Sequence, residues 1–375
     1  MEVKKLIFEE KENINKLVKC LEKDKIYLSN IPHQPGEFSA KPFKLTTTCN
    51  INRAGDYYQY YKGSKQLETF KNNMITPFKD VKVLKHNNVI LHRFNKTPLS
   101  IHPQYSITKT NKKHTIKKGL CFILKGDLIW NHFSMDWLPY LNFCRTILLK
   151  DNDIKIITKE IKFDSYHYII KNLLKIDNDT IVMKENDKQI FEDLYEITVS
   201  GPFSSGLFPY SAYCNCPIIL YKNMYSNIHK NFKDYKSNIL IYTKRNNNDI
   251  KTRNIINENK IENLLENYCK NNNLIYVSFF YKNYSIEDRI KLFNHAKIVI
   301  GPHGATNFHT LFCSKNVKII EFIFIKDCHS TQLVNLSYGL EYWQIPVPEY
   351  GQFEKNIKIS DESIQSMVDI LENDK

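Results

Sequence analysis

A short turn, Gly-Pro-His-Gly at residues 301–304, is the stretch of the chain best suited to hold an anion. The residues before it, 298–300, are all β-branched and predict a short buried strand, which the two glycines and the proline end. Residues 305–312 can continue as a helix, and the first backbone N–H groups of a helix attract negative charge. His303 adds one more hydrogen-bond donor inside the turn. An ordinary strand–turn–helix connection with a surface histidine explains the two glycines equally well.

The segments on either side place this turn inside a regular α/β pattern. Ser285 precedes three apolar residues with helical spacing, Ile286, Ile290 and Phe293, and is predicted to cap the helix that they define. After the turn, residues 316–324 form a second β-like run with a single acidic residue, Glu321. The predicted order is therefore helix, strand, turn, helix and a strand that carries a carboxylate.

A histidine and an aspartate four residues apart, His132 and Asp136, form the second group suited to chemistry. At that spacing they share one face of a helix that Asn131 can cap, while Pro139 kinks the helix or ends its first turns. A carboxylate one turn away can fix the tautomer of the imidazole and raise its basicity, as a general base requires. A helix-stabilising surface pair is the alternative. The opposite face is predicted to be buried and is apolar: Phe133, Trp137, and Tyr140 or Leu141.

Basic residues end the strand predicted at residues 237–245. Lys244 and Arg245 are its last two residues, and Arg253 lies in the polar loop beyond it. The carboxyl end of such a strand is where α/β folds bind ligands, and the forked guanidinium of Arg245 suits a diphosphate. A solvated basic loop fits the same residues.

Together these segments resemble glycosyltransferase family 61. The turn and its flanks, residues 285–322, match the family block sxxeqixlFxxAxvivGpHGAgltNxxF…vxEl. The match departs at Thr306, where glycine is usual, and at His309, where an ungapped alignment places the family's asparagine. Two further blocks are matched at single positions, which are Asn131, His132, Asp136, Leu138, Pro139, Arg245, Arg253 and Asn257. The departures bear on sugar specificity more than on the fold.

The resemblance implies an α/β fold of the GT-B type, in which two Rossmann-like domains face a cleft. It implies an inverting glycosyltransferase whose donor is a nucleoside-diphosphate sugar, a UDP-sugar being the first choice, and whose acceptor is a hydroxyl of a glycan or glycoprotein. Neither a metal nor a cofactor is implied. Glu321 would accept hydrogen bonds from the ribose hydroxyls of the donor. The full set of implied donor-binding residues is Arg245, Arg253, Gly301, His303, Gly304, Ala305, Thr306 and Glu321.

Two catalytic roles follow from this chemistry. Direct displacement at the anomeric carbon needs a base for the acceptor hydroxyl and stabilisation of the departing diphosphate. His132, steadied by Asp136, is predicted to be the base, with Asp136 itself as the second choice. Arg245, His303 and the helix start after Gly304 are predicted to stabilise the diphosphate.

The composition is that of an ordinary globular protein of 375 residues, 42% hydrophobic and 25% charged. No apolar run approaches about 18 residues, so no membrane-spanning helix is expected. Acidic residues occupy positions where a secretory signal has a basic tip and an apolar core, which predicts a cytoplasmic protein. The nine cysteines are scattered, which favours reduced thiols, and Cys214 and Cys216 lack the further ligands of a metal site.

The net charge of +13 does not by itself identify a partner. Its basic residues are spread evenly, without a block of five or six, and no recognition helix, RNA-binding aromatic motif or zinc spacing accompanies them. A nucleic-acid partner is therefore not expected. A site for a diphosphate sugar also favours local positive charge.

Two α/β domains are predicted, residues 1–225 on the acceptor side and residues 226–375 for the nucleotide sugar. A βαβ pattern over residues 154–183 and a stretch rich in Gly, Pro and Ser at 200–217 support this division. The last helix, predicted at 361–371, is expected to pack back onto the protein.

The first 80 residues match no family block. An amphipathic helix is predicted at residues 4–24, and beyond this region two short strands are predicted at 81–84 and 89–91, around a turn at 85–88.

Two other functions fit the sequence. A metal-dependent transferase would use an Asp-x-Asp motif, and the chain has two, at residues 151–153 and 177–179, both in polar turns. A non-catalytic nucleotide- or glycan-binding protein of the same fold is the second, and the departures at Thr306 and His309 leave room for it. Resistance to chelators would distinguish the metal-independent transferase from the metal-dependent one. Hydrolysis of a donor would distinguish a transferase from a protein that only binds.

Overall fold

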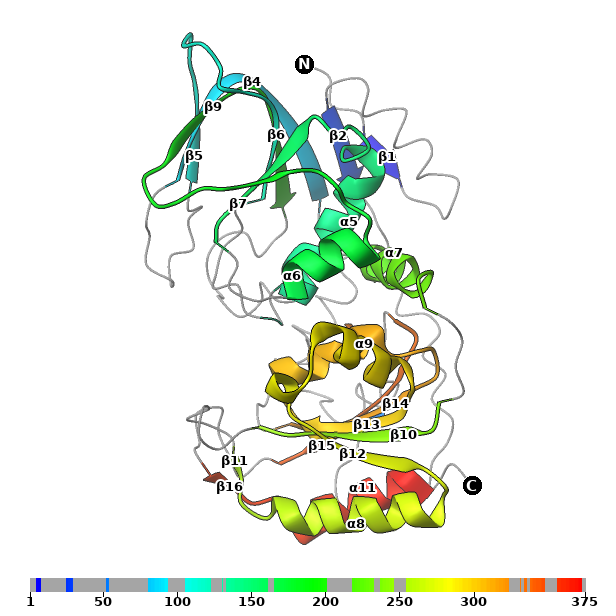
Figure 1. Ribbon diagram of the computed structural model, residues 1–375. Coiled ribbons are helices and arrows are strands. Elements are labelled where there is room, and N and C mark those ends of the chain that lie inside the picture. Colours follow the sequence, from blue (N-terminus) through cyan, green and yellow to red (C-terminus); the bar gives the residue numbers. More distant parts are fainter. Residues whose placement is uncertain are drawn as a thin grey trace. The chain divides into compact units, whose positions relative to one another are not determined.

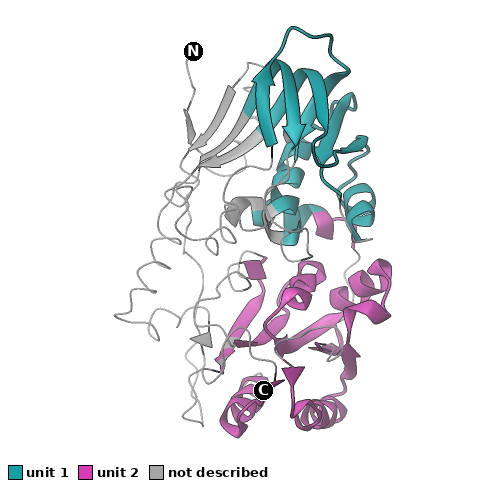
Figure 2. Ribbon diagram, turned by 90° about the vertical axis from the view of Figure 1, so that its left-hand side faces the viewer, with its two compact units in different colours: residues 1–34, 74–227 teal, residues 35–73, 228–375 magenta. Residues whose placement is uncertain are grey.

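The computed structural model of the chain describes residues 5–7, 25–29, 52–53, 80–93, 105–122, 130, 133–160, 165–200, 218–232, 237–245, 254–323, 331, 334–335, 338–347 and 356–372 (Figure 1). The chain divides into two compact units (Figure 2). Unit 1 comprises residues 1–34 and 74–227, and unit 2 comprises residues 35–73 and 228–375. The change from unit 1 to unit 2 after Asn227 lies within helix α7 (Ile218–His229).

Unit 1 is built on a mixed sheet with strand order β1–β2–β4–β9–β6–β7–β8, and β5 pairs with β4. Its strands are β1 (Lys5–Ile7), β2 (Lys25–Ser29), β4 (Asp80–Arg93), β5 (Tyr105–Lys109), β6 (Ile116–Cys121), β7 (Ile154–Thr158), β8 (Thr180–Val182) and β9 (Lys188–Ser200). β6 runs parallel to β7 and β9, and β7 runs parallel to β8. The βαβ pattern predicted from residue 154 is confirmed, with α6 (Ser165–Tyr168) and η2 (Ile169–Leu173) between β7 and β8.

The long strand β4 corrects a prediction. The two short strands expected around a turn at residues 85–88 are one continuous strand, which pairs antiparallel with β9 along most of its length. Asn88 has a φ of 51°, in the left-handed region that asparagine tolerates better than most residues, yet the register with β9 is the same on both sides of it. The apolar residues beyond Asn88, such as Val89 and Leu91, belong to the core of this unit and keep the strand paired.

At the N-terminus, the helix predicted over residues 4–24 is wrong for residues 5–7. These residues form β1, which pairs parallel with β2. Helical spacing of apolar residues does not exclude a short strand when another strand supplies hydrogen bonds. The rest of that predicted helix lies outside the described residues.

After β6, the π-helical turn η1 (Phe133–Trp137) is directly followed by α5 (Leu138–Ile147). Pro139 lies in the first turn of α5, a position where proline is tolerated. The predicted apolar face, Phe133, Trp137, Tyr140 and Leu141, is buried.

Unit 2 has a sheet with strand order β12–β10–β13–β14–β15–β3, in which the first five strands are parallel and β3 is antiparallel to β15. The strands are β3 (Asn52–Arg53), β10 (Ile239–Thr243), β12 (Ile275–Phe279), β13 (Ala296–Pro302), β14 (Lys318–Ile323) and β15 (Glu341–Pro346). A parallel sheet is normally covered on both faces, and this one is. Helices α8 (Glu258–Asn271) and α11 (Asp361–Glu372) cover one face, and α9 (Ile286–Asn294) lies over the other (Figure 1).

Local signals predicted this unit well. Ser285 caps α9, because its hydroxyl accepts a hydrogen bond from the backbone N–H of Asp288 at 3.1 Å. The predicted helix after the turn is present, but it is the 3-10 helix η5 (Ala305–Phe312) rather than an α-helix. Helix α11 packs with its apolar side chains in the core of unit 2. A two-stranded sheet, β11 (Asn254–Ile255) with β16 (Asn356–Ile357), completes this unit.

Each unit thus has an α/β sheet with parallel strands, as predicted. In unit 1 the resemblance to a Rossmann-like domain is limited to the parallel strands, because β4 adds a long antiparallel pairing. Within the part of the chain that the structure describes, no helix combines the length and the apolar character needed to cross a membrane.

Candidate functional site

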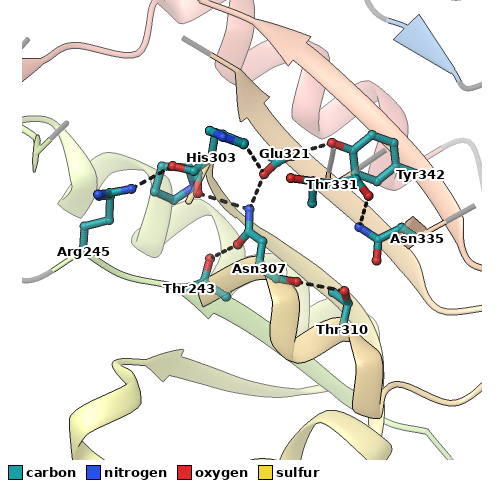
Figure 3. A network of polar contacts seen from close by, with 10 residues as sticks. Thr243, Arg245, His303, Asn307, Thr310, Glu321, Thr331, Asn335 and Tyr342 are labelled. Carbon is teal, nitrogen blue, oxygen red and sulfur yellow. Dashed lines mark hydrogen bonds and ion pairs between the residues drawn. The ribbon is translucent and has the colours of Figure 1, made fainter. Parts of the chain in front are cut away.

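The candidate site lies where three neighbouring strands of unit 2 end. β10, β13 and β14 are parallel and adjacent, so their carboxyl ends meet at one edge of the sheet. Six of the eight predicted donor-binding positions lie on or directly after these strand ends, and the seventh, Thr306, follows in the first turn of η5. In an open α/β sheet this edge is the usual place for a ligand. Figure 3 shows the polar contacts at this edge.

Glu321 and His303 form the buried centre of the site. Glu321 is fully buried on β14, and His303 is 7% exposed in the turn after β13. Nδ1 of His303 lies 2.9 Å from Oε1 of Glu321, so the ring N–H donates to the carboxylate. The hydroxyl of Tyr342, on β15, donates to the other carboxylate oxygen, Oε2. Both oxygens of Glu321 therefore already accept hydrogen bonds from the protein.

Asn307, in η5, joins this centre to β10. Its Nδ2 donates to Glu321 Oε1 at 2.6 Å and to the carbonyl of Pro302 at 3.2 Å. Its Oδ1 accepts from the hydroxyl of Thr243, the last residue of β10, at 3.0 Å. Neither Asn307 nor Thr243 was predicted as a site residue. The family's asparagine, expected at position 309, was a signal that an amide belongs in this helix.

Arg245 lies against the start of η5. Its Nη1 donates to the carbonyl of His303 at 2.8 Å. A Cβ added at Gly304 would overlap this Nη1 atom, so the absence of a side chain lets the guanidinium approach the backbone of the turn. The guanidinium thus holds the turn and brings positive charge to the helix start.

The backbone of the turn offers further donors. The N–H of His303 donates to the carbonyl of Phe322 at 2.9 Å, and the first bond of η5 is from the N–H of Asn307 to the carbonyl of Gly304 at 3.0 Å. The amides of residues 304–306 precede that bond, and such amides have no partner inside their helix. Ala305 and Thr306 are partly exposed. A helix start of this kind suits an anion, and the anion site expected from the sequence stays a prediction.

Gly301 has a packing role. A Cβ at this position would overlap the hydroxyl of Thr243 and lie 2.8 Å from the Thr243 carbonyl oxygen. β10 and β13 therefore approach each other at Gly301 more closely than any side chain allows. Its predicted contribution to donor binding stays a prediction.

Lys244 points away from the site, although the sequence placed two cations at the end of this strand. Its Nζ donates to Glu262 Oε2 at 2.8 Å and lies 3.5 Å from Glu258 Oε2, both on α8. Burial raises the pKa of Glu258 above its ordinary value. Burial also opposes ionisation of Glu262, but hydrogen bonds from Lys244, Ser278 and Tyr276 outweigh it and lower the pKa of that carboxyl. Of Lys244 and Arg245, only Arg245 contacts the turn at this edge of the sheet.

His309 is a core residue. Its ring contacts those of Phe279, Phe293 and Phe312, and its Nδ1 lies 2.8 Å from the carbonyl of Thr306. Burial lowers its pKa from 6.5 to about 3, so this imidazole is neutral at ordinary pH. The departure from the family at position 309 therefore changes the core beneath the turn rather than the edge of the site.

The predicted catalytic residues His132 and Asp136 and the predicted donor-binding residue Arg253 are not tested by the structure. His132 and Arg253 lie outside the described residues, and only the backbone of Asp136 is described. That backbone belongs to η1, and π-helical turns are frequent at functional sites. Their roles stay predictions.

The two Asp-x-Asp motifs lie in turns that precede β7 and β8, away from the carboxyl ends of these strands. Asp151 accepts from Nζ of Lys118 at 2.6 Å, and Asp179 pairs with Lys155. Among the described residues no three His, Cys, Asp or Glu side chains gather as a metal site requires. The pair Cys214 and Cys216 lies outside them.

Comparison with known families accounts for this arrangement. The family described as Glycosyltransferase 61 matches residues 130–320, just over half of the chain. The chain belongs to glycosyltransferase family 61. In this glycosyltransferase the matched region begins two residues before His132 and ends on β14, the strand that carries Glu321. No curated protein sequence matches it.

Proposed function

We propose that the turn at residues 301–306 binds the diphosphate of a nucleoside-diphosphate sugar, a UDP-sugar being the first choice. The transferase then moves the sugar to a hydroxyl of a glycan or glycoprotein with inversion at the anomeric carbon. One observation carries the proposal: the Arg245 guanidinium lies against the start of η5, at the carboxyl edge of a parallel sheet.

The charges of the site suit a diphosphate leaving group. When the glycosidic bond breaks, negative charge develops on the departing phosphate oxygens, and fixed donors stabilise it best. Arg245 and the amides of residues 304–306 supply such donors. Arg253, eight residues after Arg245 in the sequence, is proposed as a second cationic contact. In this proposal the cations of the protein take the role that a metal has in other transferases.

His303 completes this set of donors. Its Nδ1–H donates to Glu321, which fixes the orientation of the ring in the turn after β13. From this position the imidazole is proposed to add a hydrogen-bond donor to a phosphate oxygen of the ligand. Glu321, whose oxygens both accept from protein groups, is proposed to act through His303. The earlier prediction that Glu321 contacts the ribose is not needed for this role.

A nucleotide screen tests donor binding. Thermal unfolding of the full chain is followed with UDP, GDP, CMP, dTDP and their sugars, each in the presence of EDTA. A ligand that binds only the native state raises the unfolding temperature. The proposal expects a rise with one nucleotide family, undiminished by EDTA. No rise with any of the four, or a rise that EDTA abolishes, contradicts it.

The acceptor side is tested by turnover. His132 is proposed as general base, oriented by Asp136, and removal of a general base slows a reaction by about 10²–10⁴. With a verified donor and acceptor, His132→Ala is expected to lose turnover while donor affinity persists, and Asp136→Asn to lose less. If the order is reversed, Asp136 accepts the proton. Wild-type turnover in both variants removes the pair from the mechanism.

A further inference from the structure

Lys244 and Arg245, the two residues that follow β10, make contacts in two directions. The Arg245 guanidinium donates to the carbonyl of His303 in the turn after β13 (Figure 3). The Lys244 ammonium instead reaches α8, which covers one face of the sheet. The backbone N–H of Lys244 also donates to the carbonyl of Phe279, the last residue of β12, at 2.8 Å. The residue that precedes Arg245 is thus held by both its main chain and its side chain.

Two carboxylates of α8 hold the ammonium. Glu258 and Glu262 are four residues apart, so they share one face of the helix. Nζ of Lys244 lies 2.8 Å from Oε2 of Glu262 and 3.5 Å from Oε2 of Glu258. The side chains of both glutamates are 15% exposed and that of Lys244 is 30% exposed. Water therefore screens these ions less than it screens a pair on the open surface.

Two residues of β12 fix Glu262 in turn. The Ser278 hydroxyl donates to Glu262 Oε1 at 2.8 Å, and the Tyr276 hydroxyl donates to the same oxygen at 3.0 Å. Glu262 therefore joins α8, β12 and the residue before Arg245. Burial opposes the charge of Lys244, but the hydrogen bond to Glu262 and the charges of both glutamates outweigh it and raise the pKa of the ammonium above its ordinary value.

We propose that Lys244, held by Glu258 and Glu262, is a positioning residue of the donor site that acts through Arg245. The side chain of arginine has many rotamers, and an anchor one residue earlier limits those from which the guanidinium can reach the turn. Alternation of side chains along the backbone then directs Lys244 to α8 and Arg245 to the turn. The effect on nucleotide affinity rests on the proposed function, whereas the coupling between the two side chains does not.

The first test is a double-mutant cycle on unfolding in urea. Lys244→Met keeps the length of the side chain and removes its charge, and Arg245→Ala removes the bond to the His303 carbonyl. If Lys244 positions Arg245, part of that bond is already lost in Lys244→Met, so the double variant loses less stability than the sum of the single losses. Repulsion between two neighbouring cations has the opposite sign and makes the double variant lose more. Losses that are additive, or that exceed the sum, overturn the positioning role.

The second test measures UDP affinity by calorimetric titration. Lys244→Met is expected to bind UDP about 2- to 10-fold more weakly, in the lower part of the range for coupled neighbouring residues. Lys244→Arg retains the cation and is expected to restore affinity. In an Arg245→Ala background, Lys244→Met is expected to have no further effect.

A matched control comes from the same helix. Lys260→Met also removes one positive charge from α8, where Lys260 forms an exposed ion pair with Asp361 at 2.7 Å. This variant is expected to bind UDP as tightly as the wild type, and a loss equal to that of Lys244→Met assigns the effect to net charge and overturns the proposal. If Lys244→Met does not fold, Glu262→Gln replaces it in both tests, because it keeps the shape of the side chain and removes the charge that binds the ammonium.

The outcomes separate this inference from the proposed function. If the double variant loses less stability than the sum while no nucleotide binds even the wild type, the coupling of Lys244 to Arg245 stands and the donor proposal fails. If UDP binds the wild type and Lys244→Met with equal affinity, the donor proposal stands and the positioning role is overturned.

Discussion

Nδ1 of His303 and Oε1 of Glu321 lie 2.9 Å apart, and both side chains are buried. His303 lies in the turn after β13, and Glu321 lies on β14, the parallel strand next to β13. The pair joins the turn after β13 to the centre of the sheet. It also reconciles a buried carboxylate with the proposed site for a negatively charged ligand, because the carboxylate is directed at a histidine.

Two substitutions of Glu321 are expected to differ in stability. In Glu321→Gln, the amide oxygen can accept from His303 and Asn307, and its NH₂ can donate to the Tyr342 hydroxyl. Glu321→Leu removes the acceptor that these three groups share, and a buried donor that loses its acceptor costs about 1–3 kcal/mol. The free energy of unfolding in urea is therefore expected to be at least about 2 kcal/mol lower in Glu321→Leu than in Glu321→Gln. Equal stability would mean that the network does not hold the fold.

Arg245 is expected to contribute strongly to nucleotide affinity. Arg245→Ala should weaken UDP binding by about 1.5–3 kcal/mol, the range for a hydrogen bond to a charged group, and Arg245→Lys should recover only part because the fork is lost. Calorimetric titration measures both. Lys297→Ala is the control for net charge, since Lys297 is exposed on β13. Unchanged affinity in Arg245→Ala, or an equal loss in the control, removes Arg245 from the site.

Alanine substitutions at the two glycines of the turn are expected to have different effects, one on stability and the other on UDP affinity. Gly301→Ala forces a Cβ against the backbone of Thr243, and overpacking of this kind costs about 1–3 kcal/mol of stability. Gly304→Ala meets only the end of the Arg245 side chain, which can move. It should retain its thermal stability and lose UDP affinity. Thermal unfolding and titration of both variants check this contrast, and a destabilised Gly304→Ala with full affinity is the opposite result.

His309 is expected to make the protein sensitive to acid. Its pKa is about 3 in the folded state and 6.5 ordinarily, so the unfolded chain binds the proton more readily. The stability that the neutral ring provides is complete above pH 6.5 and is lost as the pH falls toward 3. Urea unfolding at pH 7 and pH 5 should show a smaller loss in His309→Leu than in wild type. An equal loss in both would assign the acid sensitivity to other groups.

Local patterns in the sequence predicted the parts of the fold that depend on near neighbours. The strand, turn and helix around residues 301–304, the cap at Ser285 and the βαβ segment after residue 154 all follow from periodicity and turn residues. The pairing of β4 with β9 joins residues 96 to 120 positions apart, and no local pattern reports it.

The sequence predicted which residues belong to the candidate site, but it did not predict which of them contact one another. Alternation along a strand sends Thr243 and Arg245 to one face and Lys244 to the other, a distinction that a count of basic residues misses. Asn307 was missed because its partners come from three strands that meet only in the fold. Four of the eight residues of η5 are polar, so polarity alone did not single out Asn307.

Backbone amide exchange can show whether the diphosphate binds at the turn of residues 304–306. UDP, with EDTA present, is expected to slow hydrogen exchange of the amides of residues 304–306, because the diphosphate becomes their partner. The same nucleotide should give less protection in Arg245→Ala. If UDP binds the protein, as titration would show, but exchange in this turn is unchanged and slows elsewhere, the donor site lies in another part of the molecule and the account is contradicted.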